Sequence, residues 1–326
     1  MVKSFNMQNF WATLPKPLFA LAPLANVTDA AFRRVIAKYG KPDVLFTEFV
    51  SADGLVKGNR EVLLRDLLFS EAEHPIVAQF FTSTPKHMEE AATLARDSGF
   101  DGIDINMGCP DRSIEKQSAG AALIKNPKLA QELIFAAKQG AGPLPVSVKT
   151  RLGYNHPALD EWLPLLLEAK PAAITIHART RKEMSKVPAR WEKIADAVKL
   201  ARGSEVLIIG NGDVADLNDA RKKVSETGCD GVMLGRAIFG NPWLFAEKIP
   251  TPEEKLQVLV EHTKLFEELL GDIKNFSIMK KHYKAYVGGF EGAKELRMEL
   301  MDVERAEEVE KIVGAFLARD KEPVLI

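Results

Sequence analysis

The feature that most constrains the fold is a series of eight short, β-rich apolar runs separated by helix-length segments. Successive runs start 25 to 44 residues apart. This spacing is typical of repeated β-loop-α-loop units, in which each helix covers the outside of a parallel sheet. Eight such units predict a closed (β/α)8 TIM barrel. The predicted strands are residues 18–24, 44–49, 76–81, 102–107, 146–151, 173–178, 206–211 and 231–236.

A weak internal repeat supports the barrel. Residues 99–105 (Gly-Phe-Asp-Gly-Ile-Asp-Ile) and 228–234 (Gly-Cys-Asp-Gly-Val-Met-Leu) share a pattern and lead into the fourth and eighth strands, as two half-barrels would. Helix starts are predicted at Thr28-Asp29, Thr84-Pro85 and Asn126-Pro127, because capping residues and prolines favour the first helical turn.

After Pro250-Thr-Pro252 the strand pattern stops and helical patterns follow at roughly 253–270, 273–287, 293–301 and 305–318. The sequence therefore predicts an α/β barrel domain, residues 1–250, followed by a small C-terminal all-helical domain, residues 251–326.

Composition limits the partners and the compartment. The 326 residues carry a net charge of −1, which excludes a globally basic nucleic-acid binder, so any nucleic acid must be held by local patches. The two cysteines lie far apart, and the apolar stretches are too short to span a bilayer. We expect a reduced, cytoplasmic protein that does not enter membranes. We also expect a monomer.

A ring of polar residues is predicted where the strands end, which is where barrels place their working residues. A purely structural barrel needs none of them. The ring contains Ala22, Pro23, Leu24, Glu48, Gln79, Asn106, Cys109, Lys149, Arg151, His177, Arg179, Asn211, Gly212, Asp213, Gly235 and Arg236.

The last two strands predict a phosphate site. They end in Gly-Asn-Gly-Asp, residues 210–213, and in Gly235-Arg236, which supply backbone N–H groups and a guanidinium. Lys149 can reach an anionic ring, and Gln79 offers a donor and an acceptor to the edge of a heterocycle. Together these residues suit an isoalloxazine better than a sugar phosphate.

Cys109 is the candidate reactive group, because it lies in a Gly-Cys-Pro turn at a strand exit. The alternative is a buried small hydrophobic residue, the common fate of a lone cysteine. That second interpretation is preferred for Cys229, to which we assign no role. His177 is either a ligand-binding residue or a barrel-core histidine. No metal is predicted, because the chain lacks metal-ligand spacings.

These residues resemble the tRNA-dihydrouridine synthase family along nearly the whole chain. The Asn-x-Gly-Cys-Pro motif in a barrel context is specific to it. The helical segment 280–297 is similar to the RNA-binding region of those enzymes. The matching segments are 21–33, 47–48, Gln79, 104–110, 119–123, 148–153, 176–181, 210–213, 235–236 and 280–297.

The resemblance implies a prosthetic FMN at the barrel mouth, reduced by NADPH. Its phosphate would lie near residues 211–213 and 235–236, and Lys149, His177, Gln79 and the strand-one backbone would surround its ring and ribityl chain. Hydride would pass from flavin N5 to C6 of a flipped-out uracil, while Cys109, as general acid, protonates C5. A thiol of ordinary pKa, near ~8.5, is mostly protonated at neutral pH and can do so.

The resemblance also implies tRNA as the partner. Asn106 and Arg181 would contact the uracil edge, and Lys280, Lys281 and Lys284 would join a positive track for the RNA backbone. The chain departs from the family pattern at Asn26, where glycine is usual, and in the loop 182–191. Asparagine tolerates left-handed backbone angles, so the first turn is expected to survive.

Two other functions stay open. One is an FMN barrel oxidoreductase on a free pyrimidine, such as a dihydroorotate dehydrogenase, against which the helical tail argues. The other is a catalytically inactive tRNA-binding protein, against which the combined cysteine, lysine and flavin positions argue. The uridine that would be modified is left open as well.

Overall fold

The structure, a computed structural model, describes residues 9–58 and 60–319. The chain forms two compact units, which are described separately. The first contains residues 9–25, Pro42–Leu68 and His74–Gly235. The second contains Asn26–Lys41, Phe69–Glu73 and the chain from Arg236 onward. The domain boundary between residues 250 and 251 stays a prediction.

Eight parallel strands form one curled sheet in the first unit, in the order β1-β8-β7-β6-β5-β4-β3-β2. A parallel bridge between Ala20 and Val44 joins the two ends of this order, so the predicted barrel is confirmed. The strands are β1 (Leu18–Leu21), β2 (Leu45–Ser51), β3 (Ile76–Phe81), β4 (Gly102–Asn106), β5 (Val146–Arg151), β6 (Ala173–His177), β7 (Leu207–Asn211) and β8 (Gly231–Leu234).

Two strands, β3 and β5, have the predicted bounds, and several others end earlier at the carboxyl edge. β1 ends at Leu21 although the pattern predicts strand to residue 24. The reason is Pro23, which has no N–H group for the ladder, so the chain turns away after Ala22 N donates to Leu234 O at 2.8 Å. The strand ends thus become loops where the predicted ring of polar residues begins.

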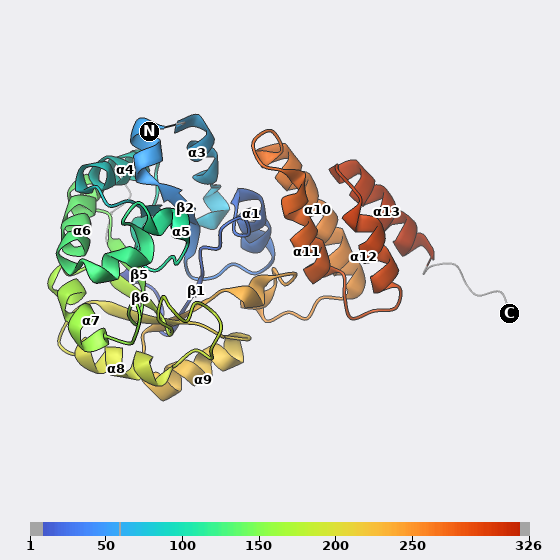
Figure 1. Ribbon diagram of the computed structural model, residues 1–326. Helices are drawn as coiled ribbons and strands as arrows, with labels where there is room; N and C mark the ends of the chain where they lie inside the picture. Colours follow the sequence, from blue (N-terminus) through green and yellow to red (C-terminus); the bar gives the residue numbers. More distant parts are fainter. Residues whose placement is uncertain (1–8, 59, 320–326) are drawn as a thin grey trace. The chain divides into compact units, whose positions relative to one another are not determined.

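Helices surround this sheet (Figure 1). Pro85 and Pro127 open two of them, and the Asn126 side chain accepts from Leu129 N, as predicted from the sequence. The helices are α2 (Ala52–Lys57), α3 (Arg60–Asp66), α4 (Pro85–Asp97), α5 (Arg112–Glu115), α6 (Pro127–Ala141), α7 (Leu159–Glu168), α8 (Glu192–Leu200) and α9 (Leu217–Thr227), with the 3-10 turns η1 (Phe10–Ala12) and η3 (Gly120–Lys125).

The barrel interior changes from apolar to polar along its axis. The lower part is a buried cluster that includes Trp11, Leu18, Phe46, Val77 and Ile209. Toward the carboxyl ends of the strands the inward positions carry amides, carboxylates and cations instead. The apolar end supplies most of the hydrophobic stabilisation, and the polar end is available for chemistry.

The second unit is helical. The helix after β1, α1 (Ala30–Tyr39), packs on α10 (Pro252–Leu270), which also contacts α11 (Met279–Tyr286) and α13 (Ala306–Arg319). The remaining elements are η2 (Glu71–Glu73), η4 (Arg236–Ile238), η5 (Leu244–Ala246), η6 (Phe276–Ile278) and α12 (Ala293–Met301). Among the described residues, no helix is long and apolar enough to cross a membrane.

The predicted helix 273–287 is shorter in the structure, where it becomes η6 and α11. The cause is Asn275, whose side chain accepts a hydrogen bond from Ser277 N at 2.8 Å and so caps a new turn. The other C-terminal helices begin and end within one residue of their predicted bounds.

Two buried histidines join the helices of the second unit. The rings of His262 on α10 and His282 on α11 lie 4.6 Å apart, and both pack against Phe32 of α1. Among the described residues, the one hydrogen bond to either ring is a long one of 3.4 Å between Tyr286 Oη and His262 Nδ1. Burial lowers the pKa of His262 well below its usual value, and burial with the nearby Lys281 charge lowers the pKa of His282 to about 3.

We predict that acid selectively destabilises this unit. Because both folded pKa values lie below the ordinary 6.5, the unfolded chain binds more protons below that pH. Stability is therefore full above about pH 6.5 and is lost as the pH falls; for His282, whose folded pKa is about 3, the loss is about 2 kcal/mol at about pH 5. Urea unfolding between pH 5 and 8 measures this loss. It should shrink in His282→Phe and persist in the exposed control His156→Gln.

Candidate active site

Strand register brings the predicted polar residues together at the carboxyl end of the barrel. Asn106 is the partner of Lys149 across β4 and β5, and Arg151 is the partner of His177 across β5 and β6. His177 in turn is the partner of Asn211 on β7. These side chains come from four neighbouring strands, so the ring expected from the sequence is continuous over this part of the barrel.

The turn that carries Cys109 is held from three sides. Asn106 Oδ1 accepts from Gly108 N at 3.1 Å and from Cys109 N at 2.9 Å. Arg151 Nε donates to Gly108 O at 2.6 Å. On the third side Ala121 N donates to Cys109 O at 2.9 Å. The half-buried thiol therefore has a fixed backbone beneath it.

Gly120 permits the third of these contacts. Its φ is +60°, and a Cβ built on it would lie 2.8 Å from Cys109 O. A side chain at this position would push the following turn away from the cysteine loop. The Ala119–Leu123 segment, which the sequence relates to the cysteine motif, is thus placed against it by backbone geometry.

The Cys109 thiol keeps its proton at neutral pH. Burial raises its pKa above the ordinary value, and the Asp111 charge acts in the same direction. A backbone hydrogen bond from Asp111 and the positive charges of Arg151 and Lys149 oppose this shift without reversing it. The group is therefore suited to donate a proton and poorly suited to be a thiolate nucleophile.

Two cations lie inside the barrel mouth. Burial, with help from Arg151, lowers the pKa of Lys149 to about 8, although the Asp104 and Cys109 charges oppose the shift. Burial likewise lowers the pKa of Arg151 to about 10. Lys149 Nζ donates to the neutral amide oxygen Asn211 Oδ1 at 3.3 Å. This site therefore carries positive charge that an anionic ligand would neutralise.

Arg179 organises the loops after β6 and β7. It forms an ion pair with Asp213, and its NH1 lies 3.1 Å from His177 Nε2. Because a guanidinium can only donate, His177 Nε2 accepts, and a neutral ring carries its proton on Nδ1. Gly212 has a φ of +125°, and a Cβ there would lie 3.0 Å from His177 Cδ2. Asp213 and His177, both predicted to bind cofactor, are thus fixed together.

The other predicted cofactor residues lie in different settings. Ala22 and Pro23 are buried and Leu24 is half-buried after β1, and Gly235 follows β8 with Ala22 Cβ 3.7 Å from the position of an added Cβ. Gln79 is fully buried, and both ends of its amide already bond to protein groups. Arg236 is exposed and begins η4 in the second unit.

The predicted substrate residues differ in how they are engaged. Asn106 is buried and spans Gln79 and the cysteine turn. Arg181 forms an ion pair with Glu115, with its Nε 2.9 Å from both carboxylate oxygens. In the second unit Lys280 and Lys281 are half-buried on α11, and Lys284 is exposed. His282 of the same helix points into the core, so it is not part of a basic face.

Sequence reasoning did not single out Asp104 or Glu115. Asp104 is a charged residue at an inward position of an apolar strand, which is a detectable sign of a buried polar network. Glu115 gave no such sign, because its partner Arg181 lies 66 residues away in sequence. The sequence also gives no sign of the pairing of His87 with Asp53, in which His87 Nδ1 lies 2.5 Å from Asp53 Oδ1.

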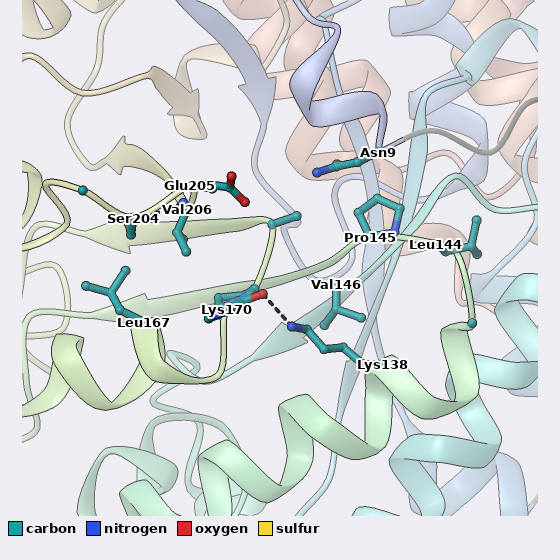
Figure 2. A pocket seen from close by; sticks show the side chains of 14 residues that line it. Asn9, Lys138, Leu144, Pro145, Val146, Leu167, Lys170, Ser204, Glu205 and Val206 are labelled. Atoms are coloured by element: carbon teal, nitrogen blue, oxygen red, sulfur yellow. Dashed lines mark hydrogen bonds between the residues drawn. The ribbon is translucent and has the colours of Figure 1, made fainter.

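A cavity of about 750 Å³ lies at the opposite end of the barrel, at the amino ends of β5, β6 and β7 (Figure 2). None of its lining residues is a predicted site residue. Lys138 reaches the Lys170 carbonyl there at 2.6 Å. The described residues contain no group of three or more His, Cys, Asp or Glu side chains that could hold a metal ion.

We predict that Cys109 reacts slowly with iodoacetamide at neutral pH. Since burial raises its pKa, the alkylation rate should still be climbing steeply at pH 9, where a free cysteine of pKa about 8.5 is already mostly ionised. Mass spectrometry of the Cys109 peptide measures the rate separately from that of buried Cys229. A rate that levels off below pH 8 would contradict a protonated thiol.

Comparisons with known proteins identify the family of the chain. Residues 20–320 match the family model described as dihydrouridine synthase (Dus). A probable tRNA-dihydrouridine synthase of Staphylococcus aureus is 43% identical over 98% of this chain and 99% of its own length. A probable tRNA-dihydrouridine synthase 2 of Bacillus subtilis is 40% identical over 95% of this chain and 97% of its own.

Solved structures agree in fold. Histamine dehydrogenase from Rhizobium superposes with a TM-score of 0.54 at 13% identity, covering 76% of this chain and 48% of its own. Morphinone reductase in complex with tetrahydroNAD superposes with a TM-score of 0.50 at 14% identity, covering 74% and 90%. From the family match over most of its length, the chain belongs to the dihydrouridine synthase family of flavin-dependent oxidoreductases.

Proposed function

We propose that the protein is a tRNA-dihydrouridine synthase that reduces the C5=C6 bond of specific uridines in tRNA, with NADPH as the reductant. The observation that carries the proposal is the Cys109 thiol on its anchored turn at the carboxyl end of the barrel, near half-buried Lys149 and buried Arg151. The names of its relatives support tRNA as the substrate.

The residues present fit FMN. Lys149 offers a half-buried cation beside Asn211, which suits an anionic ring system. The end of β8 is the less crowded place for a phosphate, because a Cβ built on Gly235 would come no closer than 3.7 Å to Ala22 Cβ, whereas one on Gly212 would lie 3.0 Å from His177 Cδ2. We propose that FMN is held by the residues predicted from the sequence, namely Ala22, Pro23, Leu24, Gln79, Lys149, His177, Asn211, Gly212, Asp213, Gly235 and Arg236.

Bound FMN supplies the hydride chemistry of the reaction. Cys109 then supplies the proton: its Sγ–H is held at the turn until negative charge develops at C5 of the uracil, to which it donates. Lys149 and Arg151 lower the energy of negative charge that builds up at the barrel mouth, because burial makes their fields less screened.

On the substrate side, Asn106 and Arg181 are the proposed uracil contacts, and Lys280, Lys281 and Lys284 are the proposed contacts with the RNA backbone. A flipped-out base needs donors and acceptors for its edge, which amide and guanidinium groups supply. We propose a monomer that works in the cytoplasm, where unmodified tRNA is available.

The proposed acid is tested by Cys109→Ala. Dihydrouridine formation in unmodified tRNA with NADPH should fall roughly 100-fold or more, because a positioned general acid is lost. Mass-spectrometric mapping of the tRNA measures the product and its position. The buried Cys229→Ala is the matched control and should keep activity.

Flavin content and NADPH oxidation in the absence of tRNA should be unchanged in Cys109→Ala, since the thiol takes no part in reducing the cofactor. Wild-type protein that oxidises NADPH but leaves tRNA untouched would contradict tRNA as the substrate and favour a free pyrimidine.

The proposed RNA contacts are tested by Lys280→Glu with Lys281→Glu. The Michaelis constant for tRNA should rise roughly three- to tenfold at low salt, and the difference should shrink as salt is added, because released counterions drive such binding. Lys294→Glu, on α12 of the same unit, is the control. An unchanged or salt-independent Michaelis constant would remove these lysines from the RNA contacts.

A further inference from the structure

Asp104 begins an uninterrupted chain of hydrogen bonds that ends at the cysteine turn. Its Oδ2 accepts from Gln79 Nε2 at 2.6 Å, and Gln79 Oε1 accepts from Asn106 Nδ2 at 3.1 Å. Asn106 Oδ1 then accepts from the backbone N–H groups of Gly108 and Cys109. All three side chains in this series of hydrogen bonds are buried.

Strand geometry explains why these residues meet. Asp104 is the register partner of Gln79 on one side and of Ser147 on the other. Asn106 lies two residues further along the same strand, so it faces the same interior one level higher. The chain therefore climbs from the middle of the barrel to the rim, where the turn carries the thiol.

The donor-to-acceptor direction of these hydrogen bonds is fixed both at the cysteine turn and at Asp104. Backbone N–H groups only donate, so Asn106 must present its oxygen to the turn and its nitrogen to Gln79. Gln79 then presents its own nitrogen downward, and the group beneath it must accept. A carboxylate meets this requirement in either rotamer, whereas a buried donor or an apolar group at residue 104 would leave the Gln79 N–H without a partner.

We propose that Asp104 is a positioning residue for proton donation: acting through Gln79 and Asn106, it holds the Gly108-Cys109 turn in the orientation that presents the thiol. The role of the thiol as proton donor rests on the proposed function, but the hydrogen-bonded connection from Asp104 to the cysteine turn does not. Asp104 touches neither substrate nor cofactor in this proposal, and Gln79, which is also a proposed FMN contact, connects it to Asn106.

The charge state of Asp104 agrees with this role. Burial raises its pKa to about 6, while hydrogen bonds from Ser147 and Gln79 and the charge of Lys149 oppose the shift. At neutral pH the group is therefore ionised and accepts on both oxygens, with Ser147 Oγ donating to Oδ1 at 2.6 Å. The Ser147 bond is a side branch, because it does not lead to the cysteine.

Three substitutions distinguish the effect of breaking this series of hydrogen bonds from the effect of disturbing the packing around Asp104. Asp104→Leu keeps the size but removes the acceptor. Asp104→Asn removes the charge but keeps an acceptor for Gln79, since its nitrogen can face Ser147 Oγ. Ser147→Ala removes the side branch and is the matched control. Each purified variant is first compared with the wild type by thermal unfolding, and only variants with a cooperative transition are tested further.

The first readout is iodoacetamide alkylation of Cys109 at about pH 8, followed by mass spectrometry without tRNA. Asp104→Leu should react roughly fivefold faster or more, because the turn opens more often when its anchor is lost. Asp104→Asn and Ser147→Ala should stay within about twofold of the wild type. If Asp104→Leu does not fold, Gln79→Met interrupts the same chain and should show the same increase.

The second readout is steady-state dihydrouridine formation. Asp104→Leu should lower kcat roughly 10- to 100-fold with little change in the Michaelis constant for tRNA, as expected for a displaced reacting group. A folded Asp104→Leu whose alkylation rate and kcat match the wild type would overturn the proposal, as would an Asp104→Asn that matches Asp104→Leu. A wild type that forms no dihydrouridine would refute the proposed function, while the alkylation arm would still decide the link.

Discussion

The closed parallel sheet imposes the constraint on which the site depends. Each strand directs alternate residues into an interior that is sealed from water, so a polar side chain there must find its partner on a neighbouring strand. Gln79, Asp104 and Ser147 satisfy one another at one level of the barrel. Asn106, one level above, completes the pairing and passes it to the cysteine turn. Hydrogen bonding that the fold requires thereby also holds the turn that carries the Cys109 thiol.

Charge inside the barrel is balanced in the same way. Burial moves the pKa of Asp104 up to about 6 and that of Lys149 down to about 8, and each charge partly restores the other. Both groups are therefore charged at neutral pH despite their burial. With Arg151 added, two positive charges lie near the single Asp104 carboxylate in this part of the barrel, which favours an anionic cofactor and makes the negative charge that would develop in a uracil ring less costly.

The strands and the placement of most site residues were predictable from the sequence, because the carboxyl ends of all strands in a barrel face the same opening. The periodic runs predicted the eight strands, and the residues at their ends predicted the positions of Cys109, Lys149 and His177. Long-range pairing was not predictable. The grouping of α1 with the C-terminal helices depends on packing around His262 and His282, and the engagement of Arg181 depends on Glu115 in a distant loop. Sequence spacing carries no information about which of several arginines meets a given carboxylate.

Burial and the neighbouring cations shift the pKa of the Cys109 thiol in opposite directions, and the stronger of the two determines what the residue can do. Neighbouring cations favour the thiolate, as in enzymes that use cysteine as a nucleophile. Burial outweighs them here, so the thiol keeps its proton in the resting site. A proton donor needs burial to have the larger effect, because an acid that has already ionised before negative charge appears on the substrate has no proton to transfer. The anchored turn then matters as much as the pKa, since a weak acid transfers its proton efficiently only when it is already in position.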